Sequence, residues 1–457
     1  MDTHHPPTVY VETQGCKLNQ ADTQALAAQF LAAGYTLATE PGAADVCVVN
    51  TCTVTHVADA KARQALRGMR RQSPNALVVA TGCYAQRAPA QLVQLEGVDL
   101  VLGNAQKGEL VAQVGRVLVM GEGPSAAGGL LLAQESTSLR TRVMGQHVHA
   151  GHDSDGLSGA QQRTRAMVKI QEGCGQVCAY CIVPKVRGRE RSIHPDELVG
   201  QVQGLAGEGY KEVVLTGTQL GTYGFDVPGA SLTRLLARIL DETAISQLRV
   251  SSLQAHEVTN ELLDLWQDSR LCPHFHLPLQ SGSAQVLARM RRRYTPAQYA
   301  AAVGMVRAGV PGASVTADVI VGFPGETEEL FEETYRFCEG MGFAAMHVFP
   351  YSLRPGTSAA HFKGQVEEAG KQERMARLLA LGKAQAAWFR QGLVGLVRPV
   401  LWEASRPVGD AQVWSGLTDN YVRVCAASGK LVRNTVTPVR LERRQGEVLW
   451  GRIQEEG

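Results

Sequence analysis

Residues 172–184 read EGCGQVCAYCIVP and contain Cys174, Cys178 and Cys181, separated by three and then two residues. Neither a fourth cysteine nor a nearby histidine follows to complete the four-ligand set of a structural zinc site. A 4Fe-4S cluster held by three thiolates leaves one iron free to bind another ligand. The spacing therefore favours an open iron-sulfur cluster, and with it a place for chemistry.

Six apolar segments that are typical of strands extend from just before this motif toward the C-terminus, and helical stretches separate most of them. The strand candidates are AMVKI (166–170), EVVLTG (212–217), LRVSS (248–252), FHLPL (275–279), VTADVIVGF (315–323) and MHVFPYS (346–352). The helical candidates are 195–208, 232–242, 261–267, 296–308 and 328–341. This alternation predicts a parallel sheet, either open and doubly wound or curved like a barrel.

In a barrel, the carboxyl ends of the strands converge on one cavity. Short polar residues and glycines gather at these predicted strand ends, so we expect them to line a single mouth. They are Thr216, Gly217, Ser251, Ser252, Gln280, Ser281, Gly322, Pro324 and Gly325. Each of them alone is equally well explained as part of a turn.

Three cysteines near the N-terminus share one local setting, in which a strand leads through a short polar turn to the cysteine. Cys16, Cys52 and Cys83 follow apolar runs at 9–11, 46–49 and 77–80, and helical segments are expected at 21–33 and 56–71. Parallel sheets bind ligands beyond the carboxyl ends of their strands. We therefore expect a second three-thiolate site, and the repeated order disfavours the alternative of three unrelated loop cysteines.

The composition indicates a protein of the cytoplasm with no membrane partner. The chain has 457 residues, enough for two or three domains, and 44% of them are hydrophobic. The first fifteen residues lack an apolar signal core, and we find no apolar run of about 18 residues. Cysteines stay reduced in that compartment, so the grouped ones indicate metal or catalysis. Cys47, Cys272, Cys338 and Cys425 are expected to be ordinary buried thiols.

Two further regions complete the domain prediction. Residues 123–163 are rich in Gly, Ser, His and Asp and are expected to form a flexible linker. Its candidate metal ligands lack flanking structure, and we assign no role to His147, His149, His152, Asp153 and Asp155. From about Arg390, short valine-rich strands predict a small all-β barrel. The expected domains are 1–122, 164–389 and 390–457.

The cysteine motif, with Tyr180 just before its last cysteine, resembles the radical S-adenosylmethionine superfamily. Together with the N-terminal trio, three segments resemble the methylthiotransferases over nearly the whole chain: CIVPKVRGRERS (181–192), HLPLQSGSAQVLARMRRRY (276–294) and DVIVGFPGETEE (318–329). NTCTVTHVADAKARQALR (50–67) and TGCYAQR (81–87) look most like the tRNA threonylcarbamoyladenosine branch. Enzymes acting on isopentenyladenosine or on a ribosomal-protein aspartate are the alternatives.

The resemblance implies an α/β fold with an N-terminal parallel-sheet domain, a central partial (β/α)6 radical-SAM barrel and a C-terminal TRAM-like RNA-binding barrel. It implies two 4Fe-4S clusters, one on Cys174, Cys178 and Cys181 and one on Cys16, Cys52 and Cys83. A radical made from S-adenosylmethionine would take hydrogen from carbon two of adenine, so the cofactors carry the difficult step and no catalytic side chain is assigned.

The expected contacts of S-adenosylmethionine are Tyr180, Thr216, Gly217 and Ser252. The family often has an acidic residue near the position of Gln254. This chain departs from that pattern, so Gln254 is not among the expected contacts of S-adenosylmethionine.

The implied partners are tRNA and an electron donor such as flavodoxin or ferredoxin. Phosphate contacts are expected from arginines of the C-terminal barrel: Arg423, Arg433, Arg440, Arg443 and Arg444. The run Arg289, Arg291, Arg292 and Arg293 is expected either to guide the tRNA backbone or to form a basic helix face. An electron-transfer protein, or an RNA-binding protein with zinc on its cysteines, is a competing class that the two three-cysteine sets disfavour.

Overall fold

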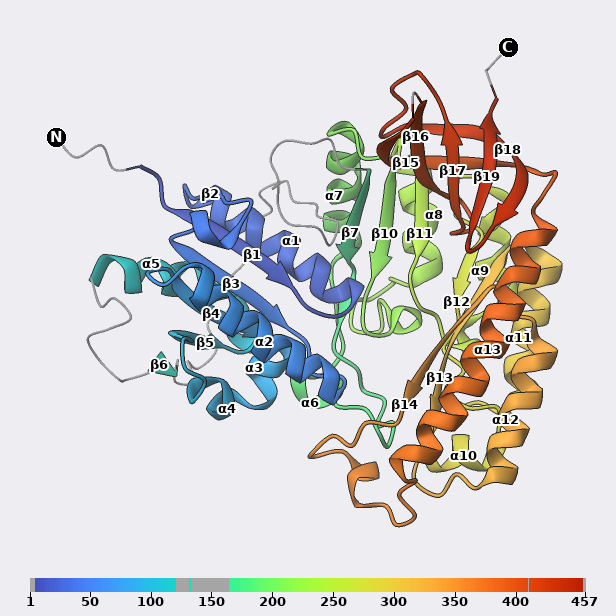
Figure 1. Ribbon diagram of the computed structural model, residues 1–457, viewed down its shortest axis with the longest axis horizontal. Helices are drawn as coiled ribbons and strands as arrows, with labels where there is room; N and C mark the ends of the chain where they lie inside the picture. Colours follow the sequence, from blue (N-terminus) through green and yellow to red (C-terminus); the bar gives the residue numbers. More distant parts are fainter. Residues whose placement is uncertain (1–4, 121–130, 133–163, 410, 455–457) are drawn as a thin grey trace. The chain divides into compact units, whose positions relative to one another are not determined.

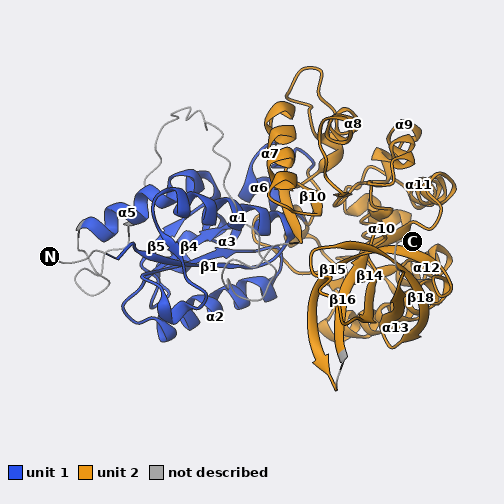
Figure 2. Ribbon diagram, turned by 90° about the horizontal axis from the view of Figure 1, so that it is seen from above, with its two compact units in different colours: residues 1–161, 172–176, 181–190 blue, residues 162–171, 177–180, 191–457 orange. Residues whose placement is uncertain are grey.

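The computed structural model describes residues 5–120, 131–132, 164–409 and 411–454 (Figure 1). The chain forms two compact units, coloured separately in Figure 2. The N-terminal unit comprises Met1–Gln161, Glu172–Gln176 and Cys181–Glu190. The C-terminal unit comprises Gln162–Gln171, Val177–Tyr180 and Arg191–Gly457. The segments of the N-terminal unit at 172–176 and 181–190 flank the middle cysteine of the central motif. The sequence prediction placed the whole motif in the second domain, 164–389.

A six-stranded parallel sheet forms the centre of the N-terminal unit, in the order β2-β1-β3-β4-β5-β6. Its strands are β1 (Thr8–Thr13), β2 (Thr36–Leu37), β3 (Val46–Thr51), β4 (Leu77–Gly82), β5 (Leu100–Leu102) and β6 (Leu131–Leu132). Strands β3 and β4 are buried at every residue, as expected for central strands covered on both faces. The predicted parallel-sheet domain is confirmed.

Helices cover both faces of this sheet. They are α1 (Lys17–Ala32), α2 (His56–Gln72), α3 (Cys83–Arg87), α4 (Pro89–Val93) and α5 (Leu110–Met120), with the 3-10 helices η1 (Pro41–Ala43) and η2 (Asn104–Glu109). Phe30 of α1 and Val114 of α5 pack in one core cluster, and Leu66 of α2 packs in the cluster on the other face. Helix α1 begins directly after Cys16, earlier than residue 21 where we expected it.

The expected linker at 123–163 lies largely outside the described residues, and so do the histidines and aspartates within it. Its described part, β6, pairs in parallel with β5 and supplies an edge strand of the sheet. The linker prediction is therefore wrong at these two residues. A two-residue strand inside the short apolar run 130–133 gives no clear period in the sequence, which explains the error.

Six parallel strands form the curved sheet of the C-terminal unit. Two three-stranded sheets have the orders β11-β10-β7 and β12-β13-β14, and a parallel bridge between Ser252 and His276 joins them. The strands are β7 (Arg165–Lys169), β10 (Glu212–Thr216), β11 (Gln247–Val250), β12 (His274–His276), β13 (Ser314–Val321) and β14 (Ala345–Pro350). All six overlap the predicted strands, although β12 ends three residues before the predicted strand 275–279 does, and the expected partial (β/α)6 arrangement is confirmed.

Helices separate these strands and pack against them. They are α7 (Pro195–Gly207), α8 (Leu232–Glu242), α9 (Asn260–Asp264) with η5 (Leu265–Gln267), α11 (Pro296–Gly309) and α12 (Glu328–Met341). Leu236, Val303 and Phe331 from three of them share one core with Val213 and Val319 of the strands. Shorter elements are α6 (Val183–Arg187), β8 (Gln171–Glu172), β9 (Arg191–Ser192), η3 (Leu220–Thr222), η4 (Ala255–Glu257), α10 (Ala284–Arg289) and η6 (Ser358–His361).

The C-terminal segment is a closed five-stranded barrel in the order β15-β16-β17-β19-β18, as predicted. Its strands are β15 (Val397–Val408), β16 (Ala411–Thr418), β17 (Arg423–Ala427), β18 (Val436–Gln445) and β19 (Val448–Ile453). The long helix α13 (Glu368–Gly392) precedes it, and sequence reasoning missed this helix. The expected boundary at 389/390 falls inside the last turn of α13, so it does not separate two elements.

A buried ion cluster explains why the barrel and the curved sheet belong to one unit. Glu212 of β10 accepts from Arg165 at 2.7 Å and from Arg249 at 2.8 Å. Arg165 also pairs with Glu403 of β15 at 2.9 Å, and Arg249 donates to the Asp419 carbonyl at 2.8 Å. The same guanidinium groups therefore hold the sheet and the barrel together.

No helix in the described part of the chain is both long enough and apolar enough to span a bilayer.

Replacing Glu212 with Gln leaves two buried guanidinium groups without their shared carboxylate. We expect a loss of about 3–5 kcal/mol in the free energy of unfolding of this unit, measured as an earlier urea transition. Glu197→Gln, an exposed residue of α7, is the matched control and should change stability by less than about 0.5 kcal/mol. Equal effects of the two variants would contradict the role of Glu212.

The pH dependence of the same interaction provides a second prediction. Burial raises the pKa of the Glu212 carboxyl, but Arg165 and Arg249 outweigh it and lower the pKa to about 2. The unfolded value is about 4.3, so the stabilising effect is complete above roughly pH 5 and is lost as the pH falls toward 2. Acid unfolding of wild type should therefore show a stability loss in this range that Glu212→Gln lacks.

Candidate metal-cluster sites

Cys16, Cys52 and Cys83 lie at the carboxyl ends of three adjacent parallel strands. Cys16 follows β1 as the residue before α1, Cys52 directly follows β3, and Cys83 opens α3 after β4. The pairing of β1 with β3 and of β3 with β4 places these strand ends side by side. The structure thus brings the predicted N-terminal trio to one edge of the sheet.

Close backbone packing brings these cysteines together. A Cβ atom at Gly15 would lie 2.7 Å from the Cys52 sulfur, and Gly15 has a φ of +101°. Only glycine tolerates both that conformation and that approach. Burial raises the pKa of the Cys52 thiol, and negative charge on Cys16 and on Cys83 adds to this, giving about 12. A metal ion would relieve this repulsion, so three neighbouring soft ligands fit an iron-sulfur cluster.

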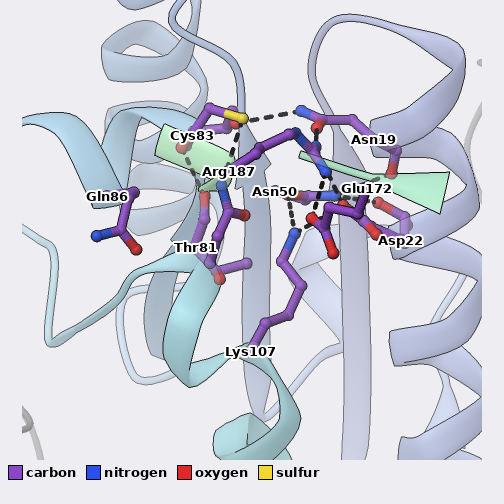
Figure 3. A network of polar contacts seen from close by, with 12 residues as sticks. Asn19, Asp22, Asn50, Thr81, Cys83, Gln86, Lys107, Glu172 and Arg187 are labelled. Atoms are coloured by element: carbon purple, nitrogen blue, oxygen red, sulfur yellow. Dashed lines mark hydrogen bonds and ion pairs between the residues drawn. The ribbon is translucent and has the colours of Figure 1, made fainter. Parts of the chain in front are cut away.

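A buried polar network lies at the same edge, centred on Arg187 of α6 (Figure 3). The Arg187 side chain is 3% exposed and donates to Asp22 at 3.1 Å, to Glu172 at 2.7 Å and to Asn19. Lys107 donates to the same Asp22 oxygen at 2.9 Å. Burial lowers the pKa of the Arg187 guanidinium, but the nearby negative charge of Cys83, Asp22 and Glu172 outweighs it and raises the pKa. Arg187 is therefore charged.

The residues after Cys181 pack directly on Cys83. Ile182 and Val186 form a buried cluster with Cys83. Asn104 donates to the Val186 carbonyl at 2.8 Å and to the Cys83 sulfur at 3.5 Å. The segment that carries Cys181 and the sheet edge that carries the N-terminal trio thus share one core within the N-terminal unit.

Cys174, Cys178 and Cys181 are all partly exposed. The Cys174 sulfur accepts from the Gln176 amide at 3.4 Å, and its own amide donates to the Gly188 carbonyl at 3.1 Å. Cys174 and Cys181 belong to the N-terminal unit and Cys178 to the C-terminal unit.

Arg292 lies beside Cys178 in the C-terminal unit. It donates to the Cys178 sulfur at 3.4 Å, to Gln254 at 3.1 Å and to the Tyr294 hydroxyl at 3.2 Å. Arg291 and Arg293 are exposed, and Arg291 has a φ of 58° beyond the end of α10 at Arg289. The expected basic helix face is therefore wrong, since the helix ends before these arginines and Arg292 faces the sulfur.

The residues expected to contact S-adenosylmethionine lie at or near strand ends. Thr216 ends β10 with its side chain buried, and a Cβ on Gly217 would lie 3.0 Å from the Gln171 carbonyl. The Ser252 hydroxyl lies 2.6 Å from Nδ1 of His276, and the half-buried Tyr180 ring contacts Phe323 edge to face. Their role toward the cofactor stays a prediction.

The barrel arginines differ in how far they are available to RNA. Arg423 pairs with Glu403, Arg433 is half-buried, and Arg440 is exposed but donates to the Gly395 carbonyl at 3.2 Å. Arg443 lies over the Trp450 ring at 5.2 Å, and Arg444 donates to a backbone carbonyl. Their phosphate contacts stay a prediction.

Three of the four remaining cysteines behave as expected. Cys47, Cys272 and Cys338 are buried. Cys425 is only partly buried, because its strand β17 forms part of the wall of a small barrel, so that prediction is wrong.

Comparison with known proteins gives two family matches. Residues 8–103 match a family described as uncharacterized protein family UPF0004, and residues 168–338 match the radical SAM superfamily. The two matches correspond to the N-terminal sheet and to the curved sheet of the C-terminal unit.

Curated relatives match over most of the chain. A Bacillus subtilis strain 168 protein, named threonylcarbamoyladenosine tRNA methylthiotransferase MtaB, is 39% identical over 91% of this chain and 90% of its own length. Proteins of the same name from Aquifex aeolicus strain VF5 and Thermotoga maritima are 39% and 33% identical, over 93% and 91% of this chain and 99% and 90% of their own lengths.

Solved structures of a Kitasatospora setae protein described as radical S-adenosylmethionine methyltransferase TsrM share the fold. One, with tryptophan and a SAM analogue bound, has a TM-score of 0.54 and 14% identity, covering 88% of this chain and 79% of that chain. Another, with cobalamin and a [4Fe-4S] cluster bound, has a TM-score of 0.52 at 14% identity, covering 78% and 74%.

Replacing Arg187 with Met leaves the buried Asp22 carboxylate with one fewer positive partner. We expect a loss of about 3–5 kcal/mol in the unfolding free energy of the N-terminal unit, measured by urea denaturation of the full chain. Lys185→Met, exposed on the same helix, should have an effect below about 0.5 kcal/mol. If both variants unfold like wild type, the network does not hold this edge together.

Proposed function

The chain belongs to the radical S-adenosylmethionine methylthiotransferases, and from this premise we propose that it converts N6-threonylcarbamoyladenosine next to the tRNA anticodon into its 2-methylthio derivative. The observation that carries the proposal is the match to relatives named for this reaction at 39% identity over more than nine-tenths of the chain. The alternatives are isopentenyladenosine in tRNA and a ribosomal-protein aspartate.

Two 4Fe-4S clusters are part of the proposal, one on each set of three cysteines. The donor chemistry supports this, because each set offers three soft thiols and a fourth protein ligand is missing from both motifs. When bound to Cys174, Cys178 and Cys181, the cluster supplies the electron that cleaves S-adenosylmethionine. The second set, Cys16, Cys52 and Cys83, would hold the cluster associated with the transferred sulfur.

The chain's own residues position these ligands. Arg187 and Asn104 hold the segment after Cys181 against Cys83 through buried contacts. Arg292 donates to Cys178 and to Gln254, which fixes both side chains within the C-terminal unit. Tyr180, Thr216, Gly217 and Ser252 remain the proposed contacts of S-adenosylmethionine.

Recognition of tRNA is proposed for the C-terminal barrel and for exposed arginines. Arg440 of the barrel and Arg291 and Arg293 of the loop after α10 are exposed, as a phosphate contact requires. The closed five-stranded barrel is consistent with the TRAM-like domain that the sequence suggested. Flavodoxin or ferredoxin remains the proposed electron donor.

The substrate is tested by mass analysis of tRNA nucleosides from the source strain without this gene. We expect the 2-methylthio form of threonylcarbamoyladenosine to disappear and its unthiolated precursor to accumulate. A gene copy carrying Cys425→Ala should restore the nucleoside, whereas one carrying Cys52→Ala should not. Loss of the methylthio-isopentenyl nucleoside alone would overturn the proposed substrate and leave the reaction type intact.

The two clusters are tested by iron analysis after anaerobic reconstitution. Wild type and Cys425→Ala should each bind about eight irons per chain. Replacing Cys16, Cys52 and Cys83 with Ala should leave about four, and so should replacing Cys174, Cys178 and Cys181. Circular dichroism of each variant checks that it is folded. A wild-type chain with about four irons, or with zinc, would contradict two clusters.

A further inference from the structure

Three potential metal ligands that the sequence did not single out lie together on the curved sheet of the C-terminal unit. They are His276 at the end of β12, Asp318 in β13 and His347 in β14. One Asp318 oxygen lies 3.1 Å from Nε2 of His276 and 3.2 Å from Nδ1 of His347. The ligand atoms of all three residues lie within 4.8 Å of one another.

The register of the strands accounts for this grouping. Asp318 pairs directly with His347, and His276 pairs with Thr316, which lies on the same face of β13 as Asp318. The residues between them, such as Phe275 and Ala317, point to the opposite face and belong to the hydrophobic core. Successive side chains of a strand point to opposite faces of the sheet. In these three neighbouring strands, two imidazoles and one carboxylate therefore lie on the face opposite to that core.

A further contact fixes the orientation of His276. The Ser252 hydroxyl lies 2.6 Å from Nδ1 of His276, on the side of the ring away from Asp318. Histidines that bind metal commonly use their second ring nitrogen in such a hydrogen bond, which sets the tautomer and the direction of the ligating nitrogen. Nε2 of His276 is thereby directed at Asp318.

The distances suit a divalent ion. A first-row metal binds nitrogen and oxygen ligands at about 2.0–2.2 Å, which places neighbouring ligand atoms roughly 3 Å apart. Both separations from the Asp318 oxygen match this spacing. Two imidazoles with one carboxylate form a ligand set that suits divalent iron, manganese or zinc and leaves positions open. The His347 side chain is 60% exposed, so water or another oxygen ligand has access.

We propose that His276, Asp318 and His347 bind one divalent transition-metal ion. The site uses nitrogen and oxygen ligands and none of the six cysteines of the clusters, so it is a separate centre. It does not rest on the proposed substrate. A hydrogen-bonded trio without an ion, in which Asp318 accepts from both histidines, is the competing interpretation.

Manganese is the probe that separates these interpretations, since Mn²⁺ prefers oxygen and nitrogen to thiolate ligands. The anaerobically reconstituted full chain is titrated with Mn²⁺, and the electron paramagnetic resonance signal of the free ion is followed. Wild type should bind about one Mn²⁺ per chain. His256→Ala, which removes an exposed histidine of η4 outside the ligand group, is the matched control and should bind equally well.

Two variants remove single ligands. Loss of a hydrogen-bond partner of a metal ligand already costs roughly 10- to 100-fold in affinity, so His347→Ala and Asp318→Asn should each weaken Mn²⁺ binding by at least that factor. The near-isosteric Asp318→Asn and the exposed His347 limit damage to the fold, which the melting temperature and an unchanged iron content check. In samples soaked with zinc and then dialysed, metal analysis should show about one zinc per chain fewer in each of these two variants than in wild type.

Two results would overturn the site. One is a wild-type chain that retains neither Mn²⁺ nor additional zinc. The other is binding that His347→Ala and Asp318→Asn leave unchanged, which would place the ion elsewhere and leave the trio as a hydrogen-bonded cluster.

Discussion

The buried charge of Arg187 is the interaction on which the geometry of the N-terminal unit depends. Its guanidinium reaches Asp22 and Asn19 on α1 and Glu172 just before the central cysteine motif. A charge that is almost wholly removed from water is stable only while its partners stay in place. The segments that flank the middle cysteine of this motif are therefore fixed to the edge of the parallel sheet, where Cys16, Cys52 and Cys83 meet.

The parallel sheet itself supplies the second constraint, because adjacent parallel strands end at one edge. Three thiols placed there repel one another as they lose protons, and burial of Cys52 makes ionisation harder still. Such thiols stay protonated unless a cation shares the charge that they acquire on losing their protons. The fold thus gathers three soft potential ligands at one edge of the sheet.

Much of this architecture follows from local pattern in the sequence. Strand positions and the turn before each cysteine are local features, and the repeated order predicted the sheet edge. Arg187 and Asp22 are far apart in sequence, and a charged residue at the end of a short helix gives no sign that it will be buried. The His276, Asp318 and His347 trio was missed because strand alternation gives a face only once the register between strands is known. Helix α13 was missed because its polar and apolar residues show no clear stripe.

Both three-cysteine sets have an arginine close by, which suggests a shared electrostatic solution. In the N-terminal unit burial lowers the pKa of Arg187, but negative charge on Cys83, Asp22, Glu172 and Cys16 outweighs it and raises the pKa. In the C-terminal unit Arg292 donates directly to the Cys178 sulfur. Three thiolates at one site would concentrate negative charge, and any part of that charge that is buried is costly without compensation. A guanidinium offsets part of that charge and donates in a fixed direction. Arginine is therefore better suited than lysine to both positions.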